Sequence, residues 1–98
     1  MFLNEEVARE AMTNIVNTAL KNVVGAPKHG YHELSPTQIG VLVTKQVEEL
    51  LKVDSRRCSS MQPMVLCHSG YVAISFCFLV LLNSGRSITI TVDASTSY

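Results

Sequence analysis

Charge of either sign is scarce in this sequence. Only 16% of the 98 residues are charged, eight basic residues balance eight acidic ones, and the longest basic run is Arg56-Arg57. A protein that neutralises a row of nucleic-acid phosphates needs a clustered basic surface. Low charge together with 47% hydrophobic residues is also the opposite of a disordered composition. We therefore expect a folded chain of one domain that has no nucleic-acid partner.

Motifs that mark common catalytic sites are missing as well. There is no GxSxG, no glycine loop that would cradle a phosphate and no cysteine–histidine signature of a protease. His29 and His32 flank Gly30-Tyr31, with Glu33 beside them, but no nucleophile is marked as their partner. We predict solvated loop histidines and a protein that is not an enzyme, with no catalytic residue and no cofactor.

The sequence contains an odd number of cysteines, namely Cys58, Cys67 and Cys77. Residues 1–10 contain acidic residues, whereas a secretory signal would begin with basic residues and continue with an apolar stretch. This pattern predicts free thiols in a reducing, cytoplasmic compartment. Together with His68 the cysteines invite a zinc hypothesis, but they lie nine and ten residues apart instead of in tight pairs. The simpler interpretation is that Cys67 and Cys77 are small apolar core residues and Cys58 is a loop thiol. No metal site is therefore predicted, and a thiol or metal protein ranks third.

Residues 4–24 show the pattern of an amphipathic helix. Their apolar residues come in pairs four apart, which places a wide stripe on one side of the helix. Asn4 can cap the start, and Gly25 followed by Pro27 can end the helix. Residues 26–34 have no periodicity and predict a connection.

A second helix is predicted over residues 36–53. Ser35 is a suitable N-cap, a proline occupies the first helical position, and Gln38 completes a capping box. Leu34 and Ile39 stand at the two positions of a hydrophobic staple. Several independent signals thus agree on the start of this helix.

The chemistry changes after residues 54–63, a polar segment that contains Pro63 and predicts a loop. A short strand is indicated at about 64–67, and a longer one at 71–82, which is rich in β-branched and aromatic residues. The run at 71–82 is apolar on both faces. This is typical of a central strand that has helices on one side and a partner on the other.

Residues 83–85, Asn-Ser-Gly, suit a three-residue hairpin loop with glycine where a positive φ is wanted. Residues 86–93 then alternate, with Ser87, Thr89 and Thr91 on one face and isoleucine or valine on the other. Such alternation predicts a half-buried strand, and residues 94–98 read as a tail. The predicted fold is α+β, with two N-terminal amphipathic helices packed on a small antiparallel β-sheet in one domain over residues 1–93.

The apolar stretch at 64–82 permits an alternative. About twenty apolar residues cross a bilayer, and Arg56-Arg57 ahead of the stretch would set its orientation. However, only the 13 residues at 70–82 are nearly free of polar side chains, and His68 would lie in or near the hydrocarbon. We favour a soluble strand and keep a small membrane-anchored protein as the alternative function.

Three segments resemble the small dynein light chains: NEEVAREAMTNIVNTALKNVVG at 4–25, PTQIGVLVTKQVEELLK at 36–52 and HSGYVAISFCFLVLL at 68–82. The Tctex type is the nearer by loop length. The resemblance implies two helices packed on an antiparallel sheet, dimerisation through strands, and extended partner segments that add to a sheet edge. It also implies a cytoplasmic, cytoskeleton-associated adaptor whose partners include a motor intermediate chain.

On this resemblance, the candidate edge is the strand at 86–93, and Ser87, Thr89 and Thr91 form its partner-binding face. A non-catalytic adaptor without cofactor is therefore the leading hypothesis. The light-chain families have four strands, whereas the sequence shows two clear strands and a third at 64–67. A truncated or alternative C-terminal half is one explanation of that difference.

Overall fold

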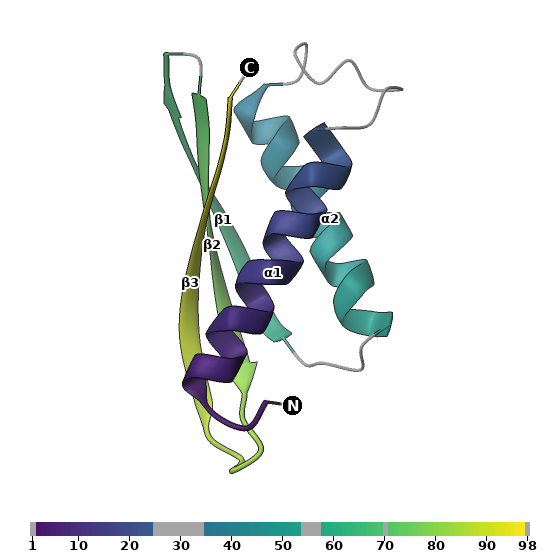
Figure 1. Cartoon of the computed structure of the whole chain (residues 1–98), viewed down its shortest axis with the longest axis vertical. Helices are drawn as coiled ribbons and strands as arrows, with labels where there is room; N and C mark the ends of the chain where they lie inside the picture. The colour runs from purple at the N-terminus through teal and green to yellow at the C-terminus, as the bar shows by residue number, and fades with distance from the viewer. Residues whose placement is uncertain (1, 25–34, 54–57, 70, 98) are drawn as a thin grey trace.

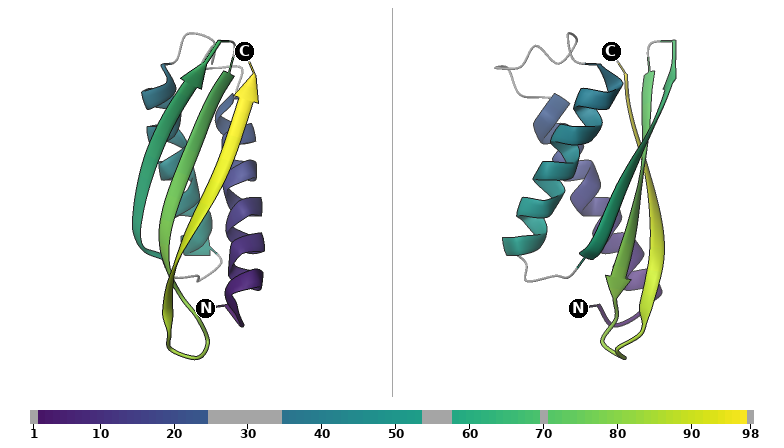
Figure 2. Two further views of the ribbon diagram at one scale, coloured as in Figure 1. Left: turned by 90° about the vertical axis from the view of Figure 1, so that its left-hand side faces the viewer. Right: turned by 180° about the vertical axis from the view of Figure 1, so that it is seen from behind.

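A computed structural model of the chain describes residues 2–24, 35–53, 58–69 and 71–97 (Figure 1). Its elements are α1 (Glu5–Val24), α2 (Pro36–Val53), β1 (Cys58–His68), β2 (Tyr71–Leu81) and β3 (Ser87–Ser97). The strands form one antiparallel sheet in the order β1-β2-β3. Both helices lie on the same face of this sheet and leave the other face open (Figure 2). The predicted α+β fold is confirmed, with β2 as the central strand.

Both helices begin where the capping signals predict. Asn4 Oδ1 accepts a hydrogen bond from the Val7 backbone N–H at 2.9 Å. Ser35 Oγ accepts from the Gln38 N–H at 3.2 Å, and Gln38 Oε1 accepts from the Ser35 N–H at 2.8 Å. These reciprocal bonds satisfy helix N–H groups that have no partner inside the helix. The predicted helix stop, the staple leucine and the loop histidines fall at 25–34, outside the described residues.

The hairpin between β2 and β3 is confirmed. Gly85 has a φ of 86°, a conformation that glycine adopts without steric cost. Its N–H donates to Leu82 O at 2.9 Å and closes the turn. The N-terminal segment supports the same turn, because Phe2 forms a parallel bridge with Leu82 and its carbonyl accepts from Asn83 N at 2.6 Å.

Two sequence-based boundaries are wrong. Residues 58–63 were predicted as loop but belong to β1, and residues 94–97 were predicted as tail but belong to β3. Both segments pair with β2, which is eleven residues long and needs partners along its whole length. The polar composition of these segments suits strands that lie at the two edges of the sheet.

The core lies between the helices and the inner face of the sheet. Alternate residues of β2 are buried against the helices, and the Phe76 and Phe78 rings lie 6.4 Å apart between centroids. α2 contributes one residue per turn, namely Ile39, Val43, Val47 and Leu51. α1 contacts β3 and α2 contacts β1, so each helix lies against one edge strand.

The stretch at 64–82 does not form one helix. Its described residues lie in β1 and β2, apart from Ser69 in a turn and Leu82 in an isolated bridge. Among the residues that the structure describes, no helix is both long and apolar enough to cross a membrane.

Candidate functional site

The interior offers no site for polar chemistry. In the described part of the chain no polar or charged side chain is buried. Binding groups must therefore lie on the surface, where the sheet presents two edges and one open face. An unpaired strand edge is a ready template for another strand.

The hydrogen-bond pattern shows which groups of β3 face its open edge. Leu82 N donates to Arg86 O at 2.8 Å, so these residues form a hydrogen-bonded pair. Opposite residues of an antiparallel ladder alternate between hydrogen-bonded and non-hydrogen-bonded pairs. With the observed register, the residues of β3 that bond to β2 are Ile88, Ile90, Val92 and Ala94. The backbone groups that point away from β2 belong to Ser87, Thr89, Thr91, Asp93 and Ser95.

The predicted partner-binding residues are therefore brought together at one edge. Ser87, Thr89 and Thr91 are exposed, and their side chains point to the open face of the sheet while their backbone N–H and C=O groups point along its plane. The same row also contains Asp93, which lies inside the strand predicted at 86–93 but was not assigned to the row, and Ser95, which lies beyond the end of that predicted strand. The signal was present, since Ala94 continues the inward alternation of the preceding isoleucine and valine residues.

The other edge, on β1, is interrupted. The same alternation makes Cys77 and Gln62 a hydrogen-bonded pair and Phe76 and Pro63 a non-hydrogen-bonded one. The nitrogen of Pro63 thus points outward, where it removes a donor from the edge but costs no bond to β2. A register shift between Cys58 and Ser60 distorts the same strand. β3 has neither proline nor register shift along its eleven residues.

A hollow is lined by residues of α1 together with Leu50 of α2. It has a volume of about 590 Å³ and a floor formed in part by Val7, Ala11 and Leu50. Glu10 and Asn14 are among the polar residues at its rim. Nothing in the structure shows what would fill this hollow, so it does not contribute to the candidate site.

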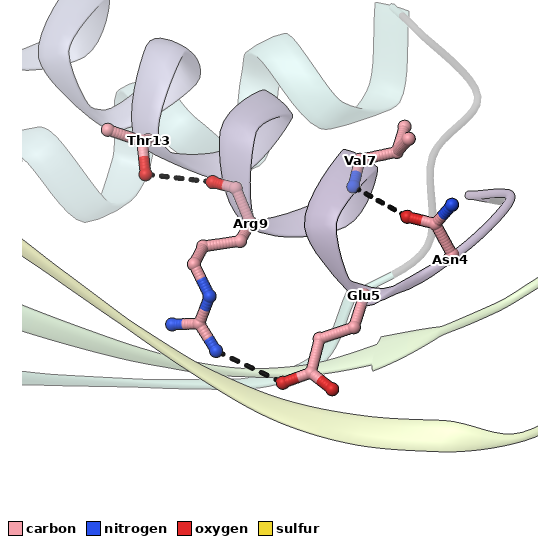
Figure 3. Close-up of polar contacts among 5 residues, drawn as sticks. All are labelled: Asn4, Glu5, Val7, Arg9 and Thr13. Carbon is pink, nitrogen blue, oxygen red and sulfur yellow. Dashed lines mark hydrogen bonds and ion pairs between the residues drawn. The ribbon is translucent and has the colours of Figure 1, made fainter.

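The opposite flank of α1 lies towards the β3 edge, and α1 projects past that edge when the sheet is viewed from its open side (Figure 2). This flank carries Glu5, Arg9 and Thr13, one helical turn apart (Figure 3). Arg9 Nη2 lies 3.1 Å from Glu5 Oε1, and Thr13 Oγ1 donates to Arg9 O at 2.8 Å. A segment added beside β3 would therefore lie between a hydroxyl-rich strand and a polar helix flank.

The open face of the sheet has an apolar half and a hydroxyl half. The apolar half comes from β1 and β2, where Met64, Leu66 and Tyr71 are 60%, 52% and 53% exposed. The hydroxyl half is the β3 row described above. Ser75 in the centre of the face donates a hydrogen bond from Oγ to Asp93 Oδ1, which joins the two halves.

Cys67, His68 and Cys77 do not form a three-residue metal site in the described part of the structure. Cys67 pairs with Val72 and Cys77 with Gln62, which puts the two cysteines five pairs apart, about 17 Å along the sheet. Both are free thiols, but Cys67 is exposed and Cys77 is half-buried, so the prediction that they are buried in the core is wrong. The described residues contain no group of three or more histidine, cysteine, aspartate or glutamate side chains placed to hold a metal ion.

Comparison with known proteins finds no protein-family model that matches the chain, no matching curated protein and no matching solved structure. The resemblance to dynein light chains, including the Tctex type, therefore stays a prediction from the sequence.

Proposed function

We propose that this protein is a non-catalytic adaptor of the dynein light-chain type, which self-associates and binds extended segments of other proteins along the β3 edge. The observation that carries the proposal is the unbroken row of outward backbone groups from Ser87 to Ser95. Main-chain hydrogen bonds of this kind give affinity to strand addition, and neighbouring side chains choose the partner. No cofactor takes part.

The contrast between the two edges supports the choice of β3. Pro63 removes a donor from the middle of the β1 edge, whereas every outward position of β3 retains its N–H. Edge strands that do not pair are usually protected by proline, lysine or a bulge. β3 carries none of these, and its one charged residue is Asp93. An edge left without protection is the edge that a guest strand can use.

The resemblance adds the biological setting of the proposal. A motor intermediate chain is the guest that it implies, and the cytoplasm, with attachment to the cytoskeleton, is the location. These parts of the proposal rest on the sequence alone. Strand addition at β3 rests in addition on the geometry and is tested separately.

The test compares two substitutions at one position. A displayed library of twelve-residue peptides is selected on the purified full chain, and selected peptides are measured by fluorescence anisotropy. Thr91→Pro removes an outward N–H but no bond to β2, whereas Thr91→Val keeps that N–H. We expect Thr91→Pro to weaken binding at least tenfold and Thr91→Val to change it less than threefold. Failure to select any peptide, or equal binding by both variants, would contradict strand addition at β3.

A further inference from the structure

Strand addition at the β3 edge does not explain why the open face of the sheet carries exposed apolar residues. Met64, Leu66 and Tyr71 form an exposed apolar group on β1 and β2, on the side of the sheet that no helix covers. Contiguous apolar surface of this kind marks an interaction site in a soluble protein. The remaining question is which surface covers it.

The lack of basic residues on the strands excludes two anionic partners for this face, a lipid surface and a nucleic acid. Asp93 is the only residue of the three strands that is charged at neutral pH when histidine is neutral. A lipid surface or a nucleic acid would be held by lysine and arginine side chains, and the face has none on its strands. The apolar half with its hydroxyl border instead suits another protein sheet.

A two-fold axis can place this face against a second copy of itself. At the centre of the face, beside Met64, lies a hollow of about 370 Å³ whose lining includes Gln62, Cys77 and Thr91. Consider a two-fold axis that lies midway between two facing sheets and runs perpendicular to their strands. Along the strands, the axis passes halfway between the row of paired residues that contains Ser75 and the row that contains Cys77. This axis places Met64 of each copy opposite Gln62 of the other copy, at the hollow.

The same rotation sets Tyr71 opposite Leu81 and Ala73 opposite Leu79 on β2, and it sets the β3 row opposite itself. On β1, Met64 and Leu66 lie opposite Gln62 and Ser60 of the second copy. β1 faces β1 and β3 faces β3 of the second copy, because the axis runs across the strands. Asp93 then faces Thr91 of the second copy and not the second Asp93, since Asp93 pairs with Ser75 and Thr91 with Cys77. Like charges are thus kept apart, and each carboxylate meets a hydroxyl donor. Mutual fit of one patch to itself is what a two-fold interface requires.

The size of the face predicts a weak dimer. Three strands of eleven residues make a face of roughly 36 × 14 Å, or about 500 Å² per copy, at the usual rise and spacing of strands. Two copies would bury about 1,000 Å², the lower end of what a specific interface needs. A dissociation constant in the micromolar range is therefore expected.

We propose that two copies of this chain pack with their open sheet faces together, related by this two-fold axis, with Met64 of each in the central hollow of the other. The inference rests on the self-association part of the proposed function and assigns it to the face of the sheet instead of to a strand edge. The outward backbone groups of the β3 edge stay free for an extended guest.

The first test is sedimentation velocity of the full chain over a concentration series. We expect a reversible dimer, and Met64→Lys should weaken it at least tenfold. Val41→Lys is the matched control, because Val41 is similarly exposed, at 47%, but lies on α2. Met64 is 60% exposed, so its substitution should leave the circular dichroism spectrum and melting temperature nearly unchanged.

The second test uses cysteine crosslinking and needs no disruptive variant. With Cys58→Ser and Cys67→Ser, only Cys77 remains, close to the proposed axis at the centre of the face. With Cys58→Ser and Cys77→Ser, only Cys67 remains, near the end of β1. A short bis-maleimide should join two copies through Cys77 at least five times more efficiently than through Cys67.

Three outcomes would overturn the packing of two faces. They are a chain that stays monomeric at every concentration, a dimer indifferent to Met64→Lys, and equal crosslinking through Cys67 and Cys77. A dimer weakened by Thr91→Pro but not by Met64→Lys would place self-association at the β3 edge. Peptide binding by Met64→Lys is measured in parallel, and its retention would show that guest binding stands whether or not the dimer does.

Discussion

Gly40 of α2 lies directly against Val65 of β1, since a β-carbon built on Gly40 would stand 3.2 Å from Val65 Cγ2. Alanine at this position would gain about 1 kcal/mol of helix propensity over glycine. The contact is tight, but Val65 is half-buried on an edge strand and can shift by a few tenths of an ångström. We therefore expect Gly40→Ala to change the free energy of unfolding by less than about 1 kcal/mol in urea titrations.

A larger side chain at the same position separates packing from propensity. Leucine has nearly the helix propensity of alanine, but it would push α2 away from β1, so Gly40→Leu should destabilise the fold by about 2 kcal/mol. Adding Val65→Ala should recover part of that loss, because the two sites share one space. Equal stability of Gly40→Ala and Gly40→Leu would show that α2 does not approach β1 this closely.

The capping box of α2 should contribute measurably to stability. Ser35→Ala removes the acceptor of the Gln38 N–H and should cost about 1 kcal/mol, seen as a lower midpoint of urea unfolding with an unchanged slope. Ser35→Thr keeps a hydroxyl acceptor and serves as the control. If both variants unfold like the parent chain, the cap does not stabilise this helix.

The N-terminal segment should stabilise the β2–β3 hairpin. Phe2 is only 4% exposed and forms the bridge to Leu82, so Phe2→Ala should destabilise by about 3 kcal/mol. In a domain of this size about 3 kcal/mol lowers the melting temperature by more than 10 °C, which calorimetry would detect. Leu3→Ala is the neighbouring control, because Leu3 is 72% exposed.

Pro63 should act as an edge protector. Pro63→Ala restores an N–H on the open side of β1 without changing the bonds to β2, so it creates a second continuous edge. We expect faster aggregation, measured by light scattering and thioflavin fluorescence, with a native circular dichroism spectrum at low concentration. Pro63→Ala combined with Gln62→Lys tests whether an exposed charge restores solubility. Unchanged aggregation of the single variant would remove this role from the proline.

Signals close in sequence predicted the helices well. Ser35 and Gln38 lie three residues apart and act on one turn, so their pattern suffices to locate the start of α2. The central place of β2 was also predictable, because a run that is apolar on both faces is typical of a central strand. In both cases, residues close together in the sequence determine the structure that forms.

Edges of the sheet were harder to predict. Residues 58–63 and 94–97 are polar and become strands because β2 offers them partners, which is a property of another part of the chain. The alternation around Thr91 identified the exposed row of β3. The outward direction of the Pro63 nitrogen could not be found that way, since it depends on the register of β1 against β2.

The order β1-β2-β3 follows the order of the chain, and this has a kinetic consequence. Each strand pairs with its neighbour in sequence, so the sheet can form by closing two hairpins in succession and needs no crossover. Contacts that are near in sequence close with little loss of chain entropy and favour fast folding. We then expect the slow step of folding to be the docking of the two helices onto the completed three-stranded sheet. The amide protons of β2 should be the last to exchange with solvent, because this strand is hydrogen-bonded on both sides.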